Sequence, residues 1–330
     1  MLRRSYIFHT AADWAGKPPW KDIPKPKVAF PLHSAIRLWR EKSLARLSSH
    51  GPPRSAGEDF FLCTNMRHNS GVSLGVADGV GGWIEQGIDC SMFSQALMYY
   101  AHRHFENGWA GEPEIDPTIE TASNAPPEGV EMAPSTALQL AYQDVLKDKS
   151  VEAGSSTGCL LTLNASSGIL RSANLGDSGF CIVRSSSMFY NSSPQTHFFN
   201  CPWQMSKFQS AKDRKNSIND LPSAAQEYST RLIDGDIIIA YTDGVADNVF
   251  PAEILKICSL VMNRPEPEAS KVQAIAQSLV HHSRRCMFSE RVSPFEIEGK
   301  RHRQLYNGQL WHGGKVDDVT VVVALVRETL

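Results

Sequence analysis

Acidic residues stand where several apolar segments of the sequence begin or end. They occur in five clusters: Gly57-Glu58-Asp59, Ala77-Asp78-Gly79, Gly176-Asp177, Thr242-Asp243-Gly244 with Asp247, and Asp317-Asp318. An Asp-Gly pair after a strand is, taken alone, most often a turn. Five clusters together point further, because a carboxylate beside an apolar strand must be paired, hydrated or bound to a cation. Ligand sets made only of oxygen select hard cations such as Mg²⁺ or Mn²⁺.

Such a pair of cations would suit the hydrolysis of phosphate esters. Two ions about 3.5–4 Å apart can share a water, lower its pKa and orient it for attack on phosphorus. Phosphate monoester hydrolysis is among the slowest uncatalysed reactions, so it needs this concentration of positive charge. An arginine would then hold the phosphate oxygens through its planar fork. Arg54, four residues before Glu58, is the candidate, and its alternative role is that of a solvated residue of the basic leading segment.

Other catalytic motifs are absent from the sequence. The turn Gly79-Val80-Gly81-Gly82 is not the dinucleotide-binding pattern, and neither a phosphate-binding loop nor a nucleophile elbow occurs. An oxidoreductase built on this turn is therefore the weakest interpretation. The seven cysteines include no C-x-x-C pair, which indicates neither a disulfide framework nor a zinc cluster.

The apolar pattern predicts antiparallel strands accompanied by separate helices. Strands are expected at 72–77, 159–163, 169–175, 179–183, 232–233 with 237–241, and 319–326, and helices at 91–104, 134–148 and 268–282. The short turns 165–168, 176–179 and 234–235 predict directly joined antiparallel strands. Residues 109–133 and 203–229 are expected to be surface loops. The sequence therefore predicts an α+β fold with antiparallel sheets faced by helices. Its longest apolar runs are too short to cross a bilayer, so no transmembrane segment is expected.

The first part of the chain differs from the rest in charge. Residues 1–54 carry 11 Lys and Arg against three acidic residues, whereas residues 55–330 carry 22 basic and 32 acidic side chains. We therefore divide the chain into a basic arm, 1–53, and a catalytic domain, 54–330. The Pro- and Lys-rich composition of the first ~50 residues favours an extended arm, which is either a solvated segment or the remnant of a mitochondrial transit sequence. A basic helix containing Ile36 and Trp39 is expected to follow. The acidic main body argues against nucleic-acid binding.

In these clusters the sequence resembles the type 2C metal-dependent protein phosphatases, the PPM family. The resemblance covers residues 54–327 in order, through the motifs Arg54-x-x-x-Glu58-Asp59, Val76-Ala-Asp78-Gly79-Val-Gly-Gly, Asn174-Leu-Gly-Asp177-Ser-Gly, Tyr241-Thr-Asp243-Gly244-Val-Ala-Asp247 and Asp317-Asp-Val-Thr-Val. The stretch 197–204, together with residues 76–83, looks like the mitochondrial branch of that family, common to fungi and animals. The family implies an αββα sandwich of two antiparallel sheets flanked by helices.

The resemblance also implies roles for individual residues. Asp78 would bridge two metal ions, with Glu58 on one and Asp243 and Asp317 on the other. The Gly79 carbonyl would be a further ligand, Asp59 would act through water, and Arg54 would hold phosphate. A third, weaker ion would lie at Asp177 and Asp247. In one position the sequence departs from the pattern: many members have a histidine where Val80 stands, and that histidine is a candidate general acid. Slower chemistry or a shifted pH profile is the expected consequence.

The leading hypothesis is therefore an enzyme that hydrolyses phosphoserine and phosphothreonine in proteins with Mg²⁺ or Mn²⁺. The alternative is a catalytically silent member that binds phosphoproteins as a scaffold, which would require the loss of a metal ligand. The partners of the enzyme would be phosphoprotein substrates. The branch resemblance and the basic beginning imply the mitochondrial matrix, with the cytoplasm as the alternative.

Overall fold

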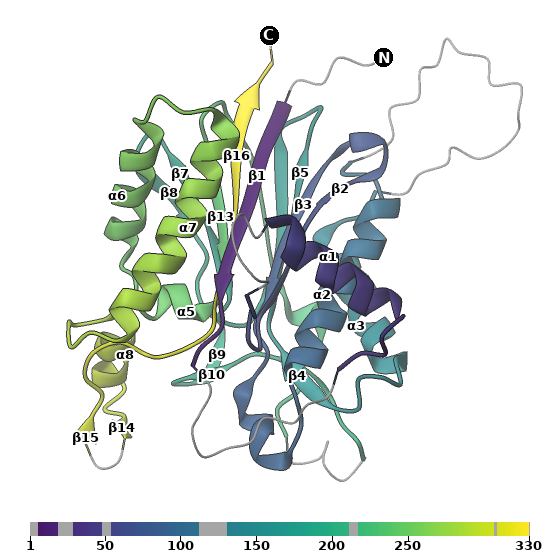
Figure 1. Ribbon diagram of the computed structural model, residues 1–330, viewed down its shortest axis with the longest axis vertical. Helices are drawn as coiled ribbons and strands as arrows, with labels where there is room; N and C mark the ends of the chain where they lie inside the picture. Colours follow the sequence, from purple (N-terminus) through teal and green to yellow (C-terminus); the bar gives the residue numbers. More distant parts are fainter. Residues whose placement is uncertain are drawn as a thin grey trace, which may run out of the picture.

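Two five-stranded antiparallel sheets form the centre of the molecule (Figure 1). The computed structural model describes residues 6–18, 29–47, 54–111, 131–210, 217–306 and 309–329. The first sheet has the strand order β1 (Tyr6–Ala15), β16 (Val319–Glu328), β13 (Ile237–Tyr241), β7 (Gly179–Arg184), β8 (Ser187–Asn191). The second has the order β12 (Gln226–Arg231), β6 (Ile169–Leu175), β5 (Gly158–Asn164), β3 (Gly71–Ala77), β2 (Phe60–Asn65). Every strand pairing within these two sheets is antiparallel, which leaves no basis for the dinucleotide-binding interpretation.

Helices cover both outer faces of the paired sheets. In Figure 1, α6 (Pro251–Met262) and α7 (Glu268–Met287) lie on one side, and α1 (Ala35–Leu47), α2 (Ser91–Asn107) and α3 (Pro134–Lys147) on the other. Apolar residues fill the layers between them: Trp14, Leu74, Phe180 and Val322 belong to the larger core cluster, and Ile239 and Leu279 to the cluster beneath α6 and α7. The arrangement confirms the expected αββα sandwich.

The start of the chain differs from the extended arm that its sequence predicts. Residues 6–15 form β1, which pairs along its whole length with β16, from Tyr6 opposite Glu328 to Ala15 opposite Val319. The two faces of β1 are both covered: Trp14 packs into the core between the sheets and Ala11 into the cluster under α7. An alanine-rich strand buried on both faces shows no polar–apolar alternation, which explains why its pattern was not recognised.

Two of the expected hairpins are instead crossings between the sheets. The turn at 165–168 joins the neighbouring strands β5 and β6, as predicted. The turn at 176–178, however, passes the chain from β6 in one sheet to β7 in the other, and the turn at 234–235 passes it from β12 to β13. Both turns are as short as hairpin turns, so sequence alone could not separate the two arrangements.

The remaining elements are short or polar. The expected helices correspond to α2, α3 and α7, and the expected strand at 232–233 is absent because the chain turns there. The polar segment 203–229 contains β11 (Met205–Lys207) and the first four residues of the edge strand β12, along which side chains are exposed or half-buried. Most of the expected loop at 109–133 lies outside the described residues. The other elements are η1 (Arg67–Asn69), η2 (Gly81–Gln86), β4 (Gly154–Ser156), β9 (Thr196–Phe198), β10 (Cys201–Pro202), β11 (Met205–Lys207), η3 (Pro222–Ala224), α5 (Asp243–Ala246), α8 (Pro294–Arg301), β14 (Leu305–Tyr306) and β15 (Gln309–Leu310).

Candidate metal centre

Strand ends from both sheets bring three aspartates together at one end of the sandwich. Asp78 follows β3 and Asp177 follows β6, both in the second sheet, while Asp243 follows β13 in the first. One carboxylate oxygen from each of the three lies within 4.8 Å of the others. Asp177 and Asp243 each keep a buried carboxylate oxygen that accepts no hydrogen bond. Buried carboxylate oxygens without donors are the ligands that a hard cation prefers, so the residues present fit a divalent metal ion.

Asp318 ties the end of β1 and the start of β2 to this centre. Its Oδ2 accepts a hydrogen bond from the peptide N–H of Glu58 at 2.9 Å, just before β2, and its Oδ1 accepts one from the peptide N–H of Lys17 at 2.6 Å, just after β1. Gly57 packs so closely that a Cβ there would lie 1.8 Å from Asp318 Oδ1, and its φ of +72° lies in the left-handed region that favours glycine. Asp318 therefore acts as a structural acceptor, while its neighbour Asp317 points to the lysines.

Asp59 and the Gly79 turn are also fixed at the centre. The Thr242 hydroxyl donates to Asp59 Oδ2 at 2.7 Å, while the buried Asp59 Oδ1 accepts no hydrogen bond. The peptide N–H of Gly79 donates to the Glu58 carbonyl at 3.1 Å, and a Cβ on Gly79 would lie 2.7 Å from the same oxygen. The structure thus holds Glu58, Asp59, Asp78 and Gly79 side by side. Their roles as metal ligands stay predictions.

Two lysines, which no motif of the sequence includes, lie among these carboxylates. We call the carboxylates the acidic cluster: Glu58, Asp59, Asp78, Asp177, Asp243, Asp247, Asp317 and Asp318. Lys17 Nζ lies 2.9 Å from Glu58 Oε2, 3.0 Å from Asp317 Oδ1 and 3.6 Å from Asp318 Oδ2. Lysines are usually solvated, and nothing in the sequence around Lys17 marks it as buried. Its position follows from β1, because the pairing of β1 with β16 places the residues after Ala15 next to those before Val319.

Lys315 is the second lysine. Its Nζ lies 2.5 Å from Asp243 Oδ2, 2.7 Å from Asp247 Oδ2 and 3.2 Å from Asp317 Oδ2. Its position two residues before Asp317 was the one available signal in the sequence. Of the two residues predicted to hold a third ion, Asp177 lies with Asp78 and Asp243, and Asp247 shares the Lys315 ammonium group with Asp243. Their role as ligands stays a prediction.

Crowding changes the protonation of the aspartates. Burial, followed by the negative charge of Asp243, raises the pKa of Asp78 and of Asp177 well above the usual value. Burial, followed by the charge of Asp318, does the same to the pKa of Asp59. Each carboxylate resists ionisation because, among the residues that the structure describes, no cationic side chain neutralises it fully. This electrostatic deficit is a second reason why divalent cations fit the site.

The positive charges of the two lysines lower the pKa values of two of the aspartates that they bind. Burial raises the pKa of Asp247 to about 7, although Lys315 opposes that rise. Burial also acts on Asp317, yet the charges of Lys315 and Lys17 together bring the pKa of Asp317 below its ordinary value. Asp317 is therefore the carboxylate that both lysines share.

Arg54 lies elsewhere. Its guanidinium binds the buried Asp13 on β1 and lies 5.9 Å from the centre of the Trp14 ring, with about half of its side chain exposed. Trp14 Nε1 donates to the Arg54 carbonyl at 3.0 Å, which fixes this part of the backbone against β1. The structure thus pairs Arg54 with Asp13 and not with the acidic cluster, and its phosphate-holding role stays a prediction.

Val80 occupies the position of the family histidine with its backbone fixed. Its peptide N–H donates to the Ser155 carbonyl at 3.0 Å, and its own carbonyl accepts from the Cys90 thiol at 2.8 Å. The side chain packs against a small apolar cluster of Trp83, Cys90 and Ala153. This side chain supplies no proton to a leaving group.

A cavity of about 290 Å³ opens beside the acidic cluster. Asp177, Asp243 and Asp247 form one part of its wall. Most of the remaining wall is apolar and comes from β13, α5, α6 and the start of α8, with Tyr241, Ala246, Val249, Pro251, Ile254 and Pro294. The cavity is large enough for side chains of a bound polypeptide, and it reaches the carboxylates directly.

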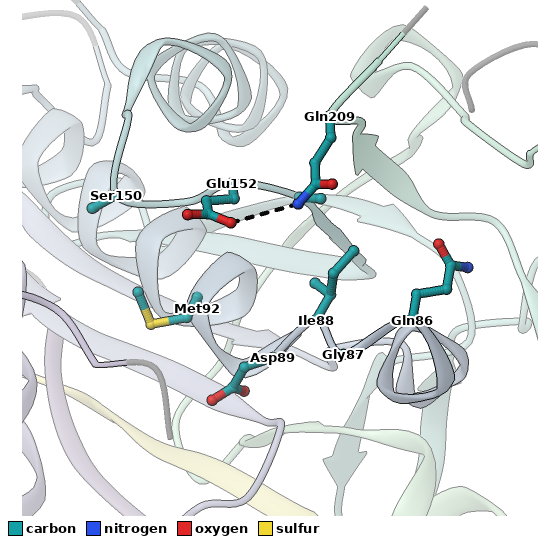
Figure 2. A pocket seen from close by; sticks show the side chains of 9 residues that line it. Gln86, Gly87, Ile88, Asp89, Met92, Ser150, Glu152 and Gln209 are labelled. Atoms are coloured by element: carbon teal, nitrogen blue, oxygen red, sulfur yellow. Dashed lines mark hydrogen bonds between the residues drawn. The ribbon is translucent and has the colours of Figure 1, made fainter. Parts of the chain in front are cut away.

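A second, smaller hollow of about 90 Å³ lies between η2, the start of α2 and the segment before β4 (Figure 2). Figure 2 shows Gln209 reaching across it to Glu152, with Nε2 and Oε2 3.5 Å apart. Asp89 and Ser150 also line it. Its lining brings together no group of carboxylates comparable to the acidic cluster, so the chemistry is assigned to the strand-end site.

Comparison with known proteins places these features in a family. No family model matches the sequence. The chain is 33% identical over 273 residues to the human protein phosphatase PTC7 homolog, covering 82% of this chain and 80% of that protein. It is 34% identical to the Xenopus laevis PTC7 homolog and 33% identical to the 5-azacytidine resistance protein azr1 of Schizosaccharomyces pombe, covering 82% of both chains in each case.

Solved structures show the same architecture. The photosystem II phosphatase PBCP superposes with a TM-score of 0.63 at 23% identity, over 97% of this chain and 99% of that chain. The catalytic domain of the serine/threonine phosphatase PstP, solved with two manganese ions, gives a TM-score of 0.53 at 15% identity, over 98% of this chain and 100% of that chain. At these identities the likeness establishes the fold.

Proposed function

We propose, because the chain belongs to the PTC7 family of protein phosphatases, that its acidic cluster binds divalent cations and hydrolyses phosphoserine and phosphothreonine in proteins. The observation that carries this proposal is the meeting of the Asp78, Asp177 and Asp243 carboxylates, within 4.8 Å of one another, from strands of both sheets. Glu58, Asp78, Asp243 and Asp317 are all present at the cluster, which favours an active enzyme over a silent phosphoprotein-binding scaffold.

The proposed ligand set is assigned from the resemblance and the positions of the residues. Asp78 would bind both ions, Glu58 would complete one site, and Asp243 and Asp317 the other. The Gly79 carbonyl and Asp59, the latter through water, would complete the coordination. Mg²⁺ or Mn²⁺ is proposed because the donors are all oxygens. When bound, the ions would supply positive charge for the phosphate and lower the pKa of a water between them.

The remaining parts of the reaction fall to groups at the edge of the cluster. Arg54 is proposed to hold the phosphate, which requires its half-exposed guanidinium to leave Asp13. Val80 offers no proton, so protonation of the leaving serine or threonine oxygen falls to a water or to another residue. The cavity bordered by Asp177 and Asp243 would receive side chains next to the phosphorylated residue.

The test is a comparison of Asp78→Asn with Asp234→Asn, the latter an exposed aspartate in the turn before β13. We expect Asp78→Asn to lower kcat on a phosphothreonine peptide with Mn²⁺ by about a thousandfold, equivalent to about 4 kcal/mol of transition-state stabilisation. Asp234→Asn should retain the wild-type rate, and a chelator should abolish it. Turnover that persists in Asp78→Asn or in the presence of the chelator would contradict the proposed function.

We further propose placement in mitochondria, from the branch resemblance and the basic leading segment. Residues 6–15 are part of the sheet, so removing them would leave β16 without its outer neighbour. Any targeting signal would therefore have to act without the loss of β1. Fractionation of cells that express the full chain tests this, and recovery in the cytosol alone would contradict it. Among the described residues, no helix has both the length and the apolar character needed to span a membrane.

A further inference from the structure

We propose that the ammonium group of Lys315 is a permanent third cation of the site, so that this phosphatase binds two exchangeable divalent ions where the resemblance implies up to three. The inference rests on the proposed function, because it concerns the same cluster. It assigns a positioning role to a residue that the sequence motifs do not include. The third ion was expected at Asp177 and Asp247, and Asp247 is the residue that Lys315 binds.

The geometry around Lys315 Nζ is that of a filled cation site. Its three carboxylate neighbours, Asp243, Asp247 and Asp317, lie 2.5, 2.7 and 3.2 Å away. An ammonium group has three N–H donors, so three carboxylate oxygens can satisfy it completely. Only 13% of the Lys315 side chain is exposed, so water contributes little to its solvation. A buried lysine charge persists only when it is paired in this way.

The side chain of Asn248 holds both peptide groups of Lys315 in place. Asn248, which is fully buried, accepts a hydrogen bond from the peptide N–H of Lys315 at 2.9 Å and donates one to its carbonyl at 2.9 Å. The preceding glycines leave no room for side chains: a Cβ on Gly314 would lie 2.2 Å from the Cys286 carbonyl, and Gly313 has a φ of +81°. Lys315 Nζ also lies 5.1 Å from the centre of the Phe295 ring. The hydrogen bonds and close packing of this turn therefore fix the backbone from which the Lys315 side chain reaches the aspartates.

A fixed ammonium and a third divalent ion would compete for the same oxygens. The oxygen of Asp247 nearest to Lys315, Oδ2, is taken by Nζ, and a divalent ion beside it would be repelled by the lysine charge at close range. The same charge lies next to Asp243 and Asp317, the proposed ligands of one exchangeable ion. Lys315 therefore supplies positive charge at this side of the centre without depending on the concentration of metal.

The number of bound Mn²⁺ ions tests this directly. Titration calorimetry and equilibrium dialysis of the full chain should give two ions for the wild type and three for Lys315→Met, which removes the charge but keeps the length of the side chain. Asp247→Asn in the Lys315→Met background should restore two ions. Lys256→Met, on the exposed side of α6, is the matched control and should bind two. Lys315→Arg, which keeps the charge, should also bind two.

The outcomes separate this inference from the proposed function. Three ions in the wild type, with the third lost in Asp247→Asn, would overturn the role of Lys315 and leave the phosphatase assignment intact. A folded Lys315→Met protein that still binds two ions would overturn it as well. If Lys315→Met does not fold, the number of Mn²⁺ ions bound by Lys315→Gln takes its place, with three ions expected. The wild type and Asp247→Asn should then both bind two ions, and a count of three in the wild type would overturn the inference. Binding of no Mn²⁺ by the wild type would instead overturn the proposed function.

Discussion

Lys17 and Lys315 make similar contacts from opposite parts of the chain. Each places its ammonium group among three carboxylates, and the two share Asp317. They differ in what holds their backbone. The peptide N–H of Lys17 donates to Asp318, a carboxylate of the cluster itself, whereas both peptide groups of Lys315 bind the neutral amide of Asn248.

This difference in anchors separates the two lysines functionally. Of the two proposed divalent ions, one would bind Glu58 and the other Asp317, so both would compete with the ammonium group of Lys17 for carboxylate oxygens. Both ions leave the Asn248 amide untouched, so Lys315 keeps its place. We infer that Lys17 neutralises the cluster until ions arrive, and that Lys315 remains beside them. Substitutions at the anchors and at the lysines can break this contrast.

Asn248→Ala should remove the anchor of Lys315. The substitution deletes the hydrogen bonds to both peptide groups of Lys315 and a third to the Gly244 carbonyl, and it leaves buried polar groups without partners. We expect the free energy of unfolding to fall by about 3 kcal/mol, as measured by urea denaturation of the metal-free protein. Asn263→Ala, at the exposed end of α6, is the control and should change it little. Equal stability of the two variants would show that the amide does not fix Lys315.

Lys17→Met should change the affinity for metal but not the number of ions. Removing a positive charge 2.9 Å from Glu58 and 3.0 Å from Asp317 removes both a competitor and a source of repulsion. We expect Mn²⁺ to bind about tenfold more tightly, a gain of about 1.4 kcal/mol. Titration calorimetry should show this with the stoichiometry unchanged, in contrast to Lys315→Met. Weaker binding would mean that Lys17 organises the ligands, and the contrast between the lysines would fail.

The sequence predicted the acidic side of this centre but not its basic side. Carboxylates at strand ends repeat a recognisable pattern, and Asp78, Asp177 and Asp243 do meet as that pattern indicates. A lysine carries no such pattern, because its long side chain can reach solvent or a buried acid from the same backbone position. Lys17 could be placed only after β1 was recognised as a strand, and β1 was concealed by its alanines and by the proline-rich residues that follow it.

The strand assignments show the same limit. The central strands β5 and β6 are predicted because apolar residues recur along both of them, whereas the edge strand β12 has the polar sequence Gln226–Arg231. The change of sheet between β6 and β7 depends on which partner each strand finds, and a short turn permits either arrangement. Local pattern therefore fixed most elements, while long-range pairing decided where Asp177 and Lys17 lie.

Glu296→Gln tests the support of the turn that carries Lys315, and its effect should be the smallest. Glu296 is fully buried at the start of α8, and its Oε2 accepts a hydrogen bond from the peptide N–H of Gly313 at 2.8 Å. Burial opposes ionisation, but hydrogen bonds from Lys300, Gly313 and His312 bring the pKa of Glu296 down to about 2. Glutamine keeps the shape but loses the charge and replaces one acceptor oxygen with an NH2 group, so we expect a loss of about 1 kcal/mol in the free energy of unfolding at pH 7.

The pH dependence identifies the cause of that loss. Because the pKa of Glu296 is lower in the folded protein, its contribution is complete above about pH 4.5 and disappears as the pH falls through about 2. Wild type and Glu296→Gln should therefore differ at pH 7, and the difference in urea denaturation should shrink below about pH 4.5 and vanish only below about pH 2. Glu296 binds the turn before Lys315, so the Mn²⁺ affinity gained in Lys17→Met should be the same in the Glu296→Gln background. A constant stability difference across this pH range would mean that the charge of Glu296 does not hold the turn.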